Sequence, residues 1–353
     1  MKRELMKGND ALAEAAIRAG CRFFAGYPIT PQSEIVEYMS WRLPEVGGKF
    51  VQSESEIAGI SMVYGAAAAG FRALTSSSGP GFSLKQEGLS YISSAELPAV
   101  VVDVMRYGTG LGDIYQGQSD YWQAVKGGGH GDYRLLVLAP SSVQETVELV
   151  QLAFDKAEEY MNPVLILTDA SIGQIMEPVT LPELKEHDPD QFSWSLKGKQ
   201  NGPFRRITST MYYIENFNAY IKDKFDRIAA NEERWESVET DDAELILVAY
   251  GISSRIAKEA VRLGRESGLK LGLIRPISLW PFPKSAFSGL PSGLKAFLTV
   301  EMSSLGQIGE DVALACRMKH PVHAFLSGDQ VPEPDMLVEK ARKILSGQEK
   351  EVF

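Results

Sequence analysis

The segment from Gln52 to Gly70 constrains the fold of this chain more than any other. It reads QSESEIAGISMVYGAAAAG, and no charged residue occurs between Glu56 and Arg72. Its many alanines and glycines let other backbones approach closely, which predicts a helix that is buried on most sides. Glu54 or Glu56 in the first turn would face the positive end of the helix dipole. An acid that heads a core helix needs no function, so the surrounding motifs decide how this segment is interpreted.

Length and charge bound the class of protein. The 353 residues are too many for one ordinary core and predict two domains. Hydrophobic residues make up 44% and charged residues 23%, as in soluble globular proteins. The formal net charge is −10 and no Lys/Arg cluster stands out, so a nucleic-acid-binding protein is not expected. No apolar run is long enough to span a membrane, and residues 1–7 lack the apolar run of a signal peptide. We therefore expect a cytoplasmic protein.

The cysteine and histidine content argues against a metal centre on this chain. Cys21 and Cys316 lie in apolar surroundings in different halves of the sequence, which favours reduced core thiols over a disulfide. Two cysteines cannot by themselves hold an iron–sulfur cluster or a structural zinc ion. The four histidines show no metal-ligand spacing with carboxylates: His130, His187, His320 and His323. We therefore expect no metal bound by this chain's own side chains.

Strand-like and helix-like segments alternate through the first half of the chain, which predicts a parallel sheet with helices on both faces. Asn9–Asp10 is predicted to cap the first helix, and Thr30–Pro31 to provide the cap and first residue of the second. A capping box from Ser142 to Glu145 opens a later helix. Strands are predicted at residues 22–26, 49–51, 72–75, 99–105, 135–138 and 163–169.

The second half begins with a change in composition. Within the first half, the glycine-rich segment from Arg106 to Asp120 is long for a connection between two elements. Loops of this length often carry a function. Beyond Pro178 the residues are typical of a linker, with one amphipathic stretch around Phe217 to Trp235. A second α/β unit starts at Glu244, with a helix capped by Ser253. The predicted division is a first domain at 1–185, a linker at 186–241 and a second domain at 242–353.

Four motifs give the chain a resemblance to a known family: Tyr27-Pro28-Ile29-Thr30-Pro31, Glu54-Ser55-Glu56, Arg106 at the end of its strand, and Ala139-Pro140-Ser141-Ser142-Val143-Gln144-Glu145. Together they resemble the alpha subunit of the 2-oxoacid:ferredoxin oxidoreductases. That resemblance implies an α/β fold in which a pyrimidine-type thiamine-diphosphate-binding domain is joined to a transketolase C-terminal-like domain, both with mostly parallel sheets. Gln32 and the segment Gly127–Asp132 look most similar to the subunit for 3-methyl-2-oxobutanoate, a branched-chain 2-oxo acid.

The resemblance also implies roles for single residues. In thiamine-diphosphate enzymes a dry carboxylate hydrogen-bonds to N1′ of the aminopyrimidine and favours the imino form that removes the C2 proton. Glu56 is the candidate for this catalytic role because it immediately precedes the apolar helix, and Glu54 is the alternative. Thr30 and Arg106 are the candidates for binding the carboxylate of a 2-oxo acid. The candidates for binding the cofactor are Pro28, Ile29, Glu56, Ser78 and Gly79.

Plainer interpretations compete with these roles. Thr30 before a proline is an ordinary helix cap, although a cap can also touch substrate. A surface ion pair is the plain interpretation of Arg106, but the end of a buried parallel strand is where such sheets place their sites. A histidine in a glycine-rich loop, such as His130, proves nothing by itself. Three polar residues of the long loop are expected to be solvated: Asp113, Gln118 and Asp120.

The long loop is also the nearest candidate for recognising the substrate's side chain. Arg106 is the only cation near it and would already bind the first carboxylate, so a second carboxylate would be buried unpaired at a large cost. Branched-chain substrates are therefore favoured over 2-oxoglutarate. The apolar surface would come from Tyr107, Leu111, Ile114 and Tyr115.

Half of the active site is expected on other chains, because no convincing Gly-Asp-Gly motif for the diphosphate and magnesium occurs. The resemblance implies a beta subunit that holds the diphosphate, Mg²⁺ and an iron–sulfur cluster, with gamma or delta subunits as further candidates. The implied reaction converts a 2-oxo acid and CoA to an acyl-CoA, CO₂ and reduced ferredoxin. Two alternatives stay open: the same chemistry on 2-oxoglutarate or pyruvate, and a noncatalytic scaffold subunit.

Overall fold

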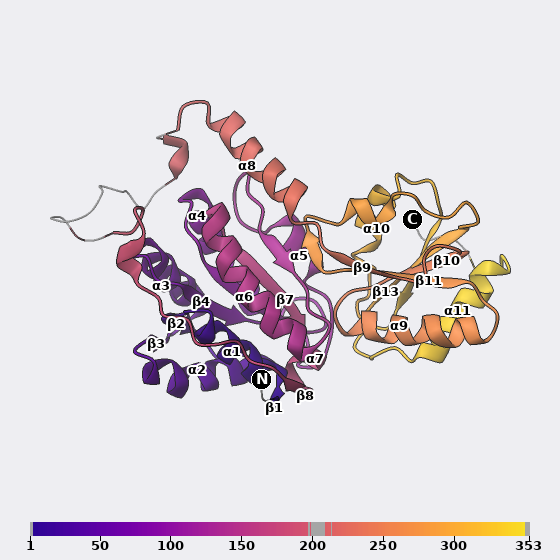
Figure 1. Ribbon diagram of the computed structural model, residues 1–353, viewed down its shortest axis with the longest axis horizontal. Coiled ribbons are helices and arrows are strands. Elements are labelled where there is room, and N and C mark those ends of the chain that lie inside the picture. Colours follow the sequence, from indigo (N-terminus) through magenta and orange to yellow (C-terminus); the bar gives the residue numbers. More distant parts are fainter. Residues whose placement is uncertain (1–2, 197, 199–208, 213, 350–353) are drawn as a thin grey trace.

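The chain forms two α/β lobes that lie side by side along the long axis of the molecule (Figure 1). The computed structural model describes residues 3–196, 198, 209–212 and 214–349. Within these ranges, no helix combines the length and the apolar character that crossing a membrane would require.

The first lobe is organised around a seven-stranded sheet with the order β12-β6-β7-β5-β4-β2-β3. Neighbouring strands are parallel except for β12, which runs antiparallel to β6. The predicted parallel sheet is therefore confirmed. Its strands are β2 (Phe23–Gly26), β3 (Lys49–Gln52), β4 (Ala73–Ser77), β5 (Val100–Met105), β6 (Leu136–Leu138), β7 (Val164–Asp169) and β12 (Ser278–Trp280).

Helices cover both faces of this sheet. Val101 and Met105 of β5 contribute to the apolar cluster beneath α3 and α4, whereas Val100, Val102 and Val104 contribute to the cluster beneath α1, α2 and α6. This alternation is what a central strand buried on both faces requires. The helices are α1 (Gly8–Arg18), α2 (Ser33–Glu45), α3 (Glu56–Ala68), α4 (Pro80–Ser94), α5 (Tyr121–Lys126), α6 (Val143–Tyr160) and α7 (Ala170–Gln174). A small antiparallel ribbon joins β1 (Glu4–Lys7) to β8 (Met176–Val179).

The second lobe contains a five-stranded sheet with the order β14-β13-β10-β11-β9, in which only the edge strand β9 is antiparallel. The predicted division at 1–185, 186–241 and 242–353 stays a prediction, and β12, which lies within 242–353, completes the first sheet. The strands are β9 (Trp235–Val238), β10 (Leu245–Val248), β11 (Leu271–Pro276), β13 (Ala296–Glu301) and β14 (Val322–Leu326). The helices of this lobe are α9 (Gly251–Glu266), α10 (Gly309–Ala315) and α11 (Pro334–Leu345). The helix α8 (Phe217–Asn231) lies in the expected linker and packs against the first lobe, where Ile228 joins an apolar cluster and Lys224 Nζ donates to Met161 O at 2.8 Å.

Helix caps were predicted less well than strands. Ser142 caps α6 as predicted, since its Oγ accepts from the Glu145 amide at 3.1 Å. Asn9 instead lies inside α1, where its side-chain amide donates to Pro31 O at 2.9 Å. Thr30 precedes a turn, and α2 begins only at Ser33. Ser253 lies in the first turn of α9 and donates to Gln118 Oε1 at 2.8 Å. Asn9 and Ser253 thus bind partners distant in sequence instead of capping their own helices.

The helix α3 is buried on most sides, as predicted, but one of its faces is exposed. Ile60 and Val63 face the core, but Ile57 is 51% and Met62 37% exposed. Ser61 and Gly65 are exposed on the same side. The small residues therefore permit close approach on a face that no other part of the described chain covers.

Buried polar groups join the two lobes. Asp169, at the end of β7, accepts from the amides of Ile172 at 2.9 Å and of Ile252 in the second lobe at 2.8 Å. Gln118 is fully buried and donates to Tyr250 O at 3.0 Å. Gly251 lies between them with φ +57°, and a Cβ there would lie 2.5 Å from Asp169 Oδ2 and 3.0 Å from Gln118 Nε2. The junction therefore leaves no room for a side chain at this position.

We predict that Gly251→Ala destabilises the protein by about 3 kcal/mol, because it adds a clash with a buried carboxylate to the strain of a left-handed alanine. The matched control is Gly268→Ala, which has φ +85° with nothing within 4 Å. That variant should lose only about 1 kcal/mol. Urea unfolding of the two variants measures the difference, and equal losses would contradict the packing argument.

Candidate active site

Four neighbouring strands of the first sheet end at one edge, and each is followed by a residue that the sequence analysis selected. Thr30 follows β2, Glu56 follows β3, Ser78 and Gly79 follow β4, and Arg106 follows β5. Carboxyl ends of parallel strands are the usual place for a ligand site. The predicted residues thus share one edge, although residues as distant as Thr30 and Arg106 contribute to it.

Glu56 is the first residue of α3 and is buried, whereas Glu54 lies before the helix and is exposed. Ser55 holds this helix start because its Oγ accepts from the Ala58 amide at 3.2 Å. The Glu56 carboxylate faces Gly81, where a Cβ would overlap both Glu56 Oε1 and Ser77 Oγ. Any side chain at Gly81 would therefore displace the carboxylate or Ser77. Of the two acids, only Glu56 lies in a dry environment.

Lys85 is a buried neighbour of Glu56 that the sequence analysis missed. Its Nζ donates to Thr75 Oγ1 at 2.9 Å and to the backbone oxygen of Glu56 at 3.4 Å. Burial lowers the pKa of Lys85 to about 8, and the Glu56 carboxylate opposes that shift. The sequence could have predicted the burial of Lys85 from its spacing. It lies three residues after Phe82 and four before Leu89, on the buried face of α4.

Arg106 is buried and is not a surface ion pair. Its guanidinium donates to Thr30 O at 2.9 Å and closely to Leu111 O. The predicted pair of Arg106 and Thr30 is therefore brought together through the Thr30 backbone, while the Thr30 side chain lies on the exposed surface. Within the described chain, Arg106 Nε has no hydrogen-bond partner. Gly79 lies against it, since a Cβ there would be 3.3 Å from Nε.

Two buried carboxyl groups lie near Arg106. Burial raises the pKa of Asp103 well above its ordinary value, and Asp120 raises it further. Burial also raises the pKa of Asp120 to about 7, against the lowering effect of Arg106. The expectation that Gln118 and Asp120 are solvated loop residues was wrong, because the loop folds back against the sheet through the pairing of Arg106 with Gln116. Asp113 and His130 are exposed.

A pocket of about 320 Å³ lies between the lobes beside Arg106 and Gly79. The second lobe contributes Ser304, Leu305 and Gln307 to its lining. Two hydrogen bonds fix the long loop there. One lies between Tyr107 Oη and Ser304 Oγ at 2.7 Å, and in the other Gln307 Nε2 donates to Ser119 O at 2.8 Å. Several predicted residues do not line the pocket: Pro28, Ile29, Thr30, Glu56 and Ser78.

The apolar residues predicted to surround the substrate's side chain divide into two groups. Tyr107 lines the pocket. The other three point to the exterior of the described chain, with exposed fractions of 79% for Leu111, 60% for Ile114 and 56% for Tyr115. No group of three His, Cys, Asp or Glu residues in the described ranges is arranged to hold a metal ion.

Comparisons with known proteins identify the family of the chain. The family described as pyruvate flavodoxin/ferredoxin oxidoreductase, thiamine diphosphate-binding, matches residues 14–242, and pyruvate:ferredoxin oxidoreductase core domain II matches residues 243–331. The ketoisovalerate oxidoreductase subunit VorB of Methanothermobacter thermautotrophicus is 51% identical over 98% of each chain. The 2-oxoglutarate synthase subunit KorA of Methanocaldococcus jannaschii is 39% identical over 91% of this chain and 94% of its own length.

A solved structure is also similar. It is the 2-oxoglutarate:ferredoxin oxidoreductase of Magnetococcus marinus with 2-oxoglutarate, coenzyme A and succinyl-CoA bound, with a TM-score of 0.84 and 26% identity. The match covers 97% of this chain and 65% of that chain, so this chain spans a little under two thirds of its length.

The raised pKa of Asp120 predicts a pH dependence of stability. Folding raises this pKa from 3.8 to about 7, so unfolding releases a proton between these pH values and stability falls as the pH rises through them. Between pH 5 and pH 7 the wild type should lose roughly 2 kcal/mol of its free energy of unfolding because of this group. We expect Asp120→Asn to abolish that loss. Urea unfolding at the two pH values measures this effect. Asp113→Asn, at an exposed position of the same loop, is the control and should leave the wild-type pH dependence unchanged.

Proposed function

The chain belongs to the pyruvate flavodoxin/ferredoxin oxidoreductase family, and we propose that it is the subunit of a 2-oxoacid:ferredoxin oxidoreductase that holds the aminopyrimidine end of thiamine diphosphate. The proposed reaction is the oxidative decarboxylation of 3-methyl-2-oxobutanoate with CoA to an acyl-CoA, CO₂ and reduced ferredoxin. The observation that carries the proposal is the buried Glu56 at the start of α3, whose carboxylate lies against Gly81 where no side chain could fit.

Glu56 fits the role of the carboxylate that faces the cofactor. Thiamine diphosphate, when bound, would supply a nucleophilic carbon and a sink for the electrons released by decarboxylation. Glu56 would exchange a proton with N1′ of the aminopyrimidine, and its dry environment strengthens that hydrogen bond. Lys85, which is buried beside it, donates to the Glu56 backbone oxygen and would help to hold the start of α3 in place. Gly79 and Ser78, from the adjoining loop, with Pro28 and Ile29, are proposed to contact the ring.

Arg106 is proposed to bind the carboxylate shared by all 2-oxo acids. A guanidinium suits this group because its planar fork matches both oxygens. Thr30 O and Leu111 O hold the guanidinium in place, and Nε is left without a partner in the described chain. Thr30 is therefore proposed to act in part by orienting Arg106, with its exposed hydroxyl available to substrate.

The pocket lining supports a substrate with an uncharged side chain. Arg106 is the only cation among the described residues that line it, and Asp120 is the acid. A second carboxylate, as in 2-oxoglutarate, would find no partner there, and burying it unpaired is costly. The relative with 51% identity is named a ketoisovalerate oxidoreductase subunit, which supports the same choice. The relative with 39% identity is named for 2-oxoglutarate, which keeps that substrate as the second candidate.

The exposed apolar surface supports a partner chain at this edge. Tyr27, Ile57, Met62 and Leu84 are 40%, 51%, 37% and 48% exposed, and three of them lie on α3 and α4, whose first turns border the site. Exposed apolar side chains gathered on neighbouring elements mark protein–protein interfaces when they form one surface. We infer that a beta subunit covers it and holds the diphosphate, Mg²⁺ and an iron–sulfur cluster. Gamma or delta subunits and ferredoxin are further proposed partners, and a cytoplasmic location stays a prediction.

The substrate is tested by kcat/KM of the complex assembled with its partner subunits. We expect 3-methyl-2-oxobutanoate to be preferred over 2-oxoglutarate by roughly tenfold or more, since the side chain of the latter carries an unpaired charge. Pyruvate should fall between them, because it carries no second charge but leaves the apolar surface unfilled. A clear preference for 2-oxoglutarate would contradict the assignment of substrate and leave the family unaffected.

The role of Glu56 is tested by Glu56→Gln in the same complex. Turnover should fall by roughly 10²-fold or more, which is the effect of losing a positioned proton-transfer group. Glu54→Gln, two residues away and exposed, is the matched control and should retain nearly full turnover. If both variants behaved alike, the assignment to Glu56 would be wrong. Full activity of Glu56→Gln would instead favour a noncatalytic scaffold.

A further inference from the structure

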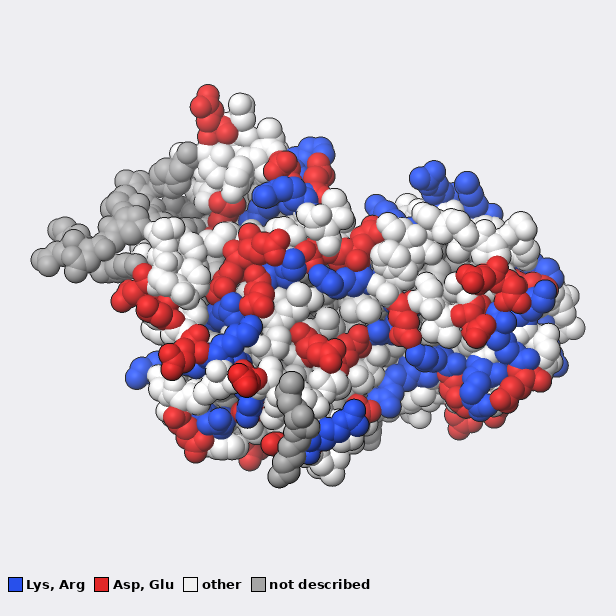
Figure 2. Space-filling model, in the orientation of Figure 1, with Lys and Arg blue, Asp and Glu red and all other residues white. Residues whose placement is uncertain are grey.

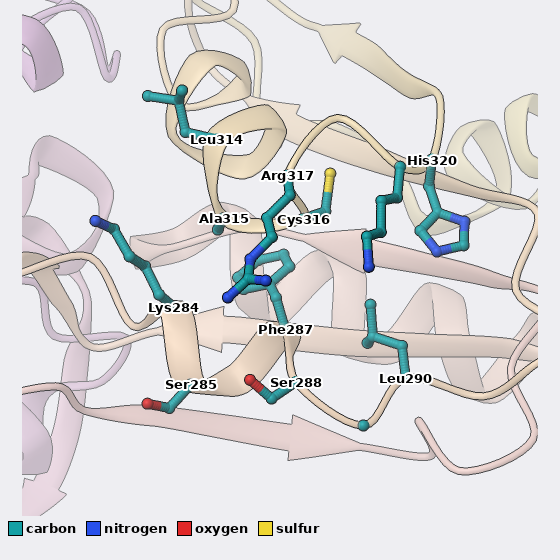
Figure 3. A pocket seen from close by; sticks show the side chains of 12 residues that line it. Lys284, Ser285, Phe287, Ser288, Leu290, Leu314, Ala315, Cys316, Arg317 and His320 are labelled. Carbon is teal, nitrogen blue, oxygen red and sulfur yellow. The ribbon is translucent and has the colours of Figure 1, made fainter.

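A second cavity, of about 880 Å³, lies entirely in the second lobe. It shares no lining residue with the pocket at Arg106. One wall is the short helix Lys284–Phe287 with the residues that follow it, and the opposite wall is the end of α10 with the turn after it (Figure 3). Nothing in the proposed reaction uses this cavity.

The cavity is strongly cationic in an acidic protein. Lys284, Arg317 and Lys319 line it, no Asp or Glu does, and the chain as a whole has a formal net charge of −10. Within the described ranges none of the three cations has an ion pair, whereas Arg262 and Lys295 of the same lobe are paired with glutamates. In Figure 2, blue side chains gather along the edge of the second lobe near α10. Three unpaired cations around one cavity repel each other unless an anion is bound.

The backbone places one of these cations at a strained position. Arg317 and Met318 have φ of +55° and +54°, in a turn after α10 where the Met318 amide donates to Ala313 O at 2.8 Å. Glycine is the usual residue in this conformation because a Cβ is unfavourable there. Figure 3 shows that the Arg317 side chain points across the cavity toward the wall that carries Phe287 and Ser288.

We propose that this cavity binds an organic phosphate, of the class of a nucleoside diphosphate. Arg317 and Lys319 would bind the phosphates, since a guanidinium fork and an ammonium group match a doubly charged anion better than a single carboxylate. The hydroxyls of Ser285 and Ser288 are available as donors at the same wall. Apolar surface for the organic part comes from Phe287, Leu290 and Leu314. The volume lies in the range of cofactor and small-molecule sites.

The test is calorimetric titration of the full-length chain with ADP and, separately, with inorganic pyrophosphate at low salt. We expect saturable binding of ADP, and an increase in Kd of at least tenfold in the double variant Arg317→Ala/Lys319→Ala. The matched control, Arg262→Ala/Lys295→Ala, removes the same charge from paired positions of the same lobe and should change Kd less than twofold. ADP should bind at least tenfold more tightly than pyrophosphate, because only ADP can use the apolar wall. Equal affinity would overturn the proposal of an organic ligand.

A second variant separates binding from folding. Arg317→Gly removes the guanidinium and relieves the left-handed strain, so it should raise the melting temperature while still weakening ADP binding at least fivefold. Three results would overturn the proposal: no ADP binding to the wild type, equal losses in the cavity and control variants, or a loss that follows Arg106→Ala instead. The last result would place the ligand in the pocket between the lobes.

Discussion

Parallel pairing of β5, β4, β2 and β3 is the constraint on which the site depends. Parallel strands must all end at the same edge, so polar residues that lie 76 positions apart, such as Thr30 and Arg106, meet without a dedicated loop to join them. The helices that follow these strands begin at this edge, which brings Glu56 and Lys85 into the same buried layer. Gly79 and Gly81 complete the arrangement, because side chains at these positions would meet Arg106 and Glu56.

Hydrogen bonds of buried polar groups attach the second lobe to this edge of the first sheet. Glu301, at the end of β13, accepts from the amides of Gln307 at 2.9 Å and Ile308 at 2.8 Å, and so shapes the loop that lines the pocket. Gln118 accepts from the Met302 amide at 3.0 Å, and Asp169 accepts from the Ile252 amide. An unpaired buried donor or acceptor would be costly, so these bonds fix the lobes in one relative position. The pocket is therefore set by the junction as much as by either sheet.

The sequence predicted what depends on local pattern. Apolar runs predicted the strands, and the spacing of Ser142 and Glu145 predicted a cap that the structure contains. The position of Glu56 before the apolar helix separated it from Glu54, and its burial agrees, although its chemical role stays a prediction.

What the sequence could not predict depends on contacts between distant segments. Asp120 resembles a solvated loop residue until Arg106 pairs with Gln116 and turns the loop inward. Ser253 resembles a cap until Gln118, from the other lobe, binds its hydroxyl. The short helix α5 has no periodic pattern to reveal it and is held by Tyr121 Oη donating to Asp311 at 2.9 Å. The exposed face of α3 was not predicted for a different reason. Composition alone does not show whether a helix is buried by its own chain or by another one.

The strand β12 belongs to the second half of the chain but completes the sheet of the first lobe. Ser278 and Trp280 pair with Leu138 and Val137 at the edge of the first sheet, although more than 100 residues separate them in the chain. A fragment that ends at residue 242, where one matched family region gives way to the next, would leave β6 as an open edge with unpaired amides and carbonyls. Such edges recruit strands from other molecules. The lobes, although distinct in shape, are therefore not separable modules, and an insertion or a break between them would affect the solubility of the first lobe before it affected any chemistry.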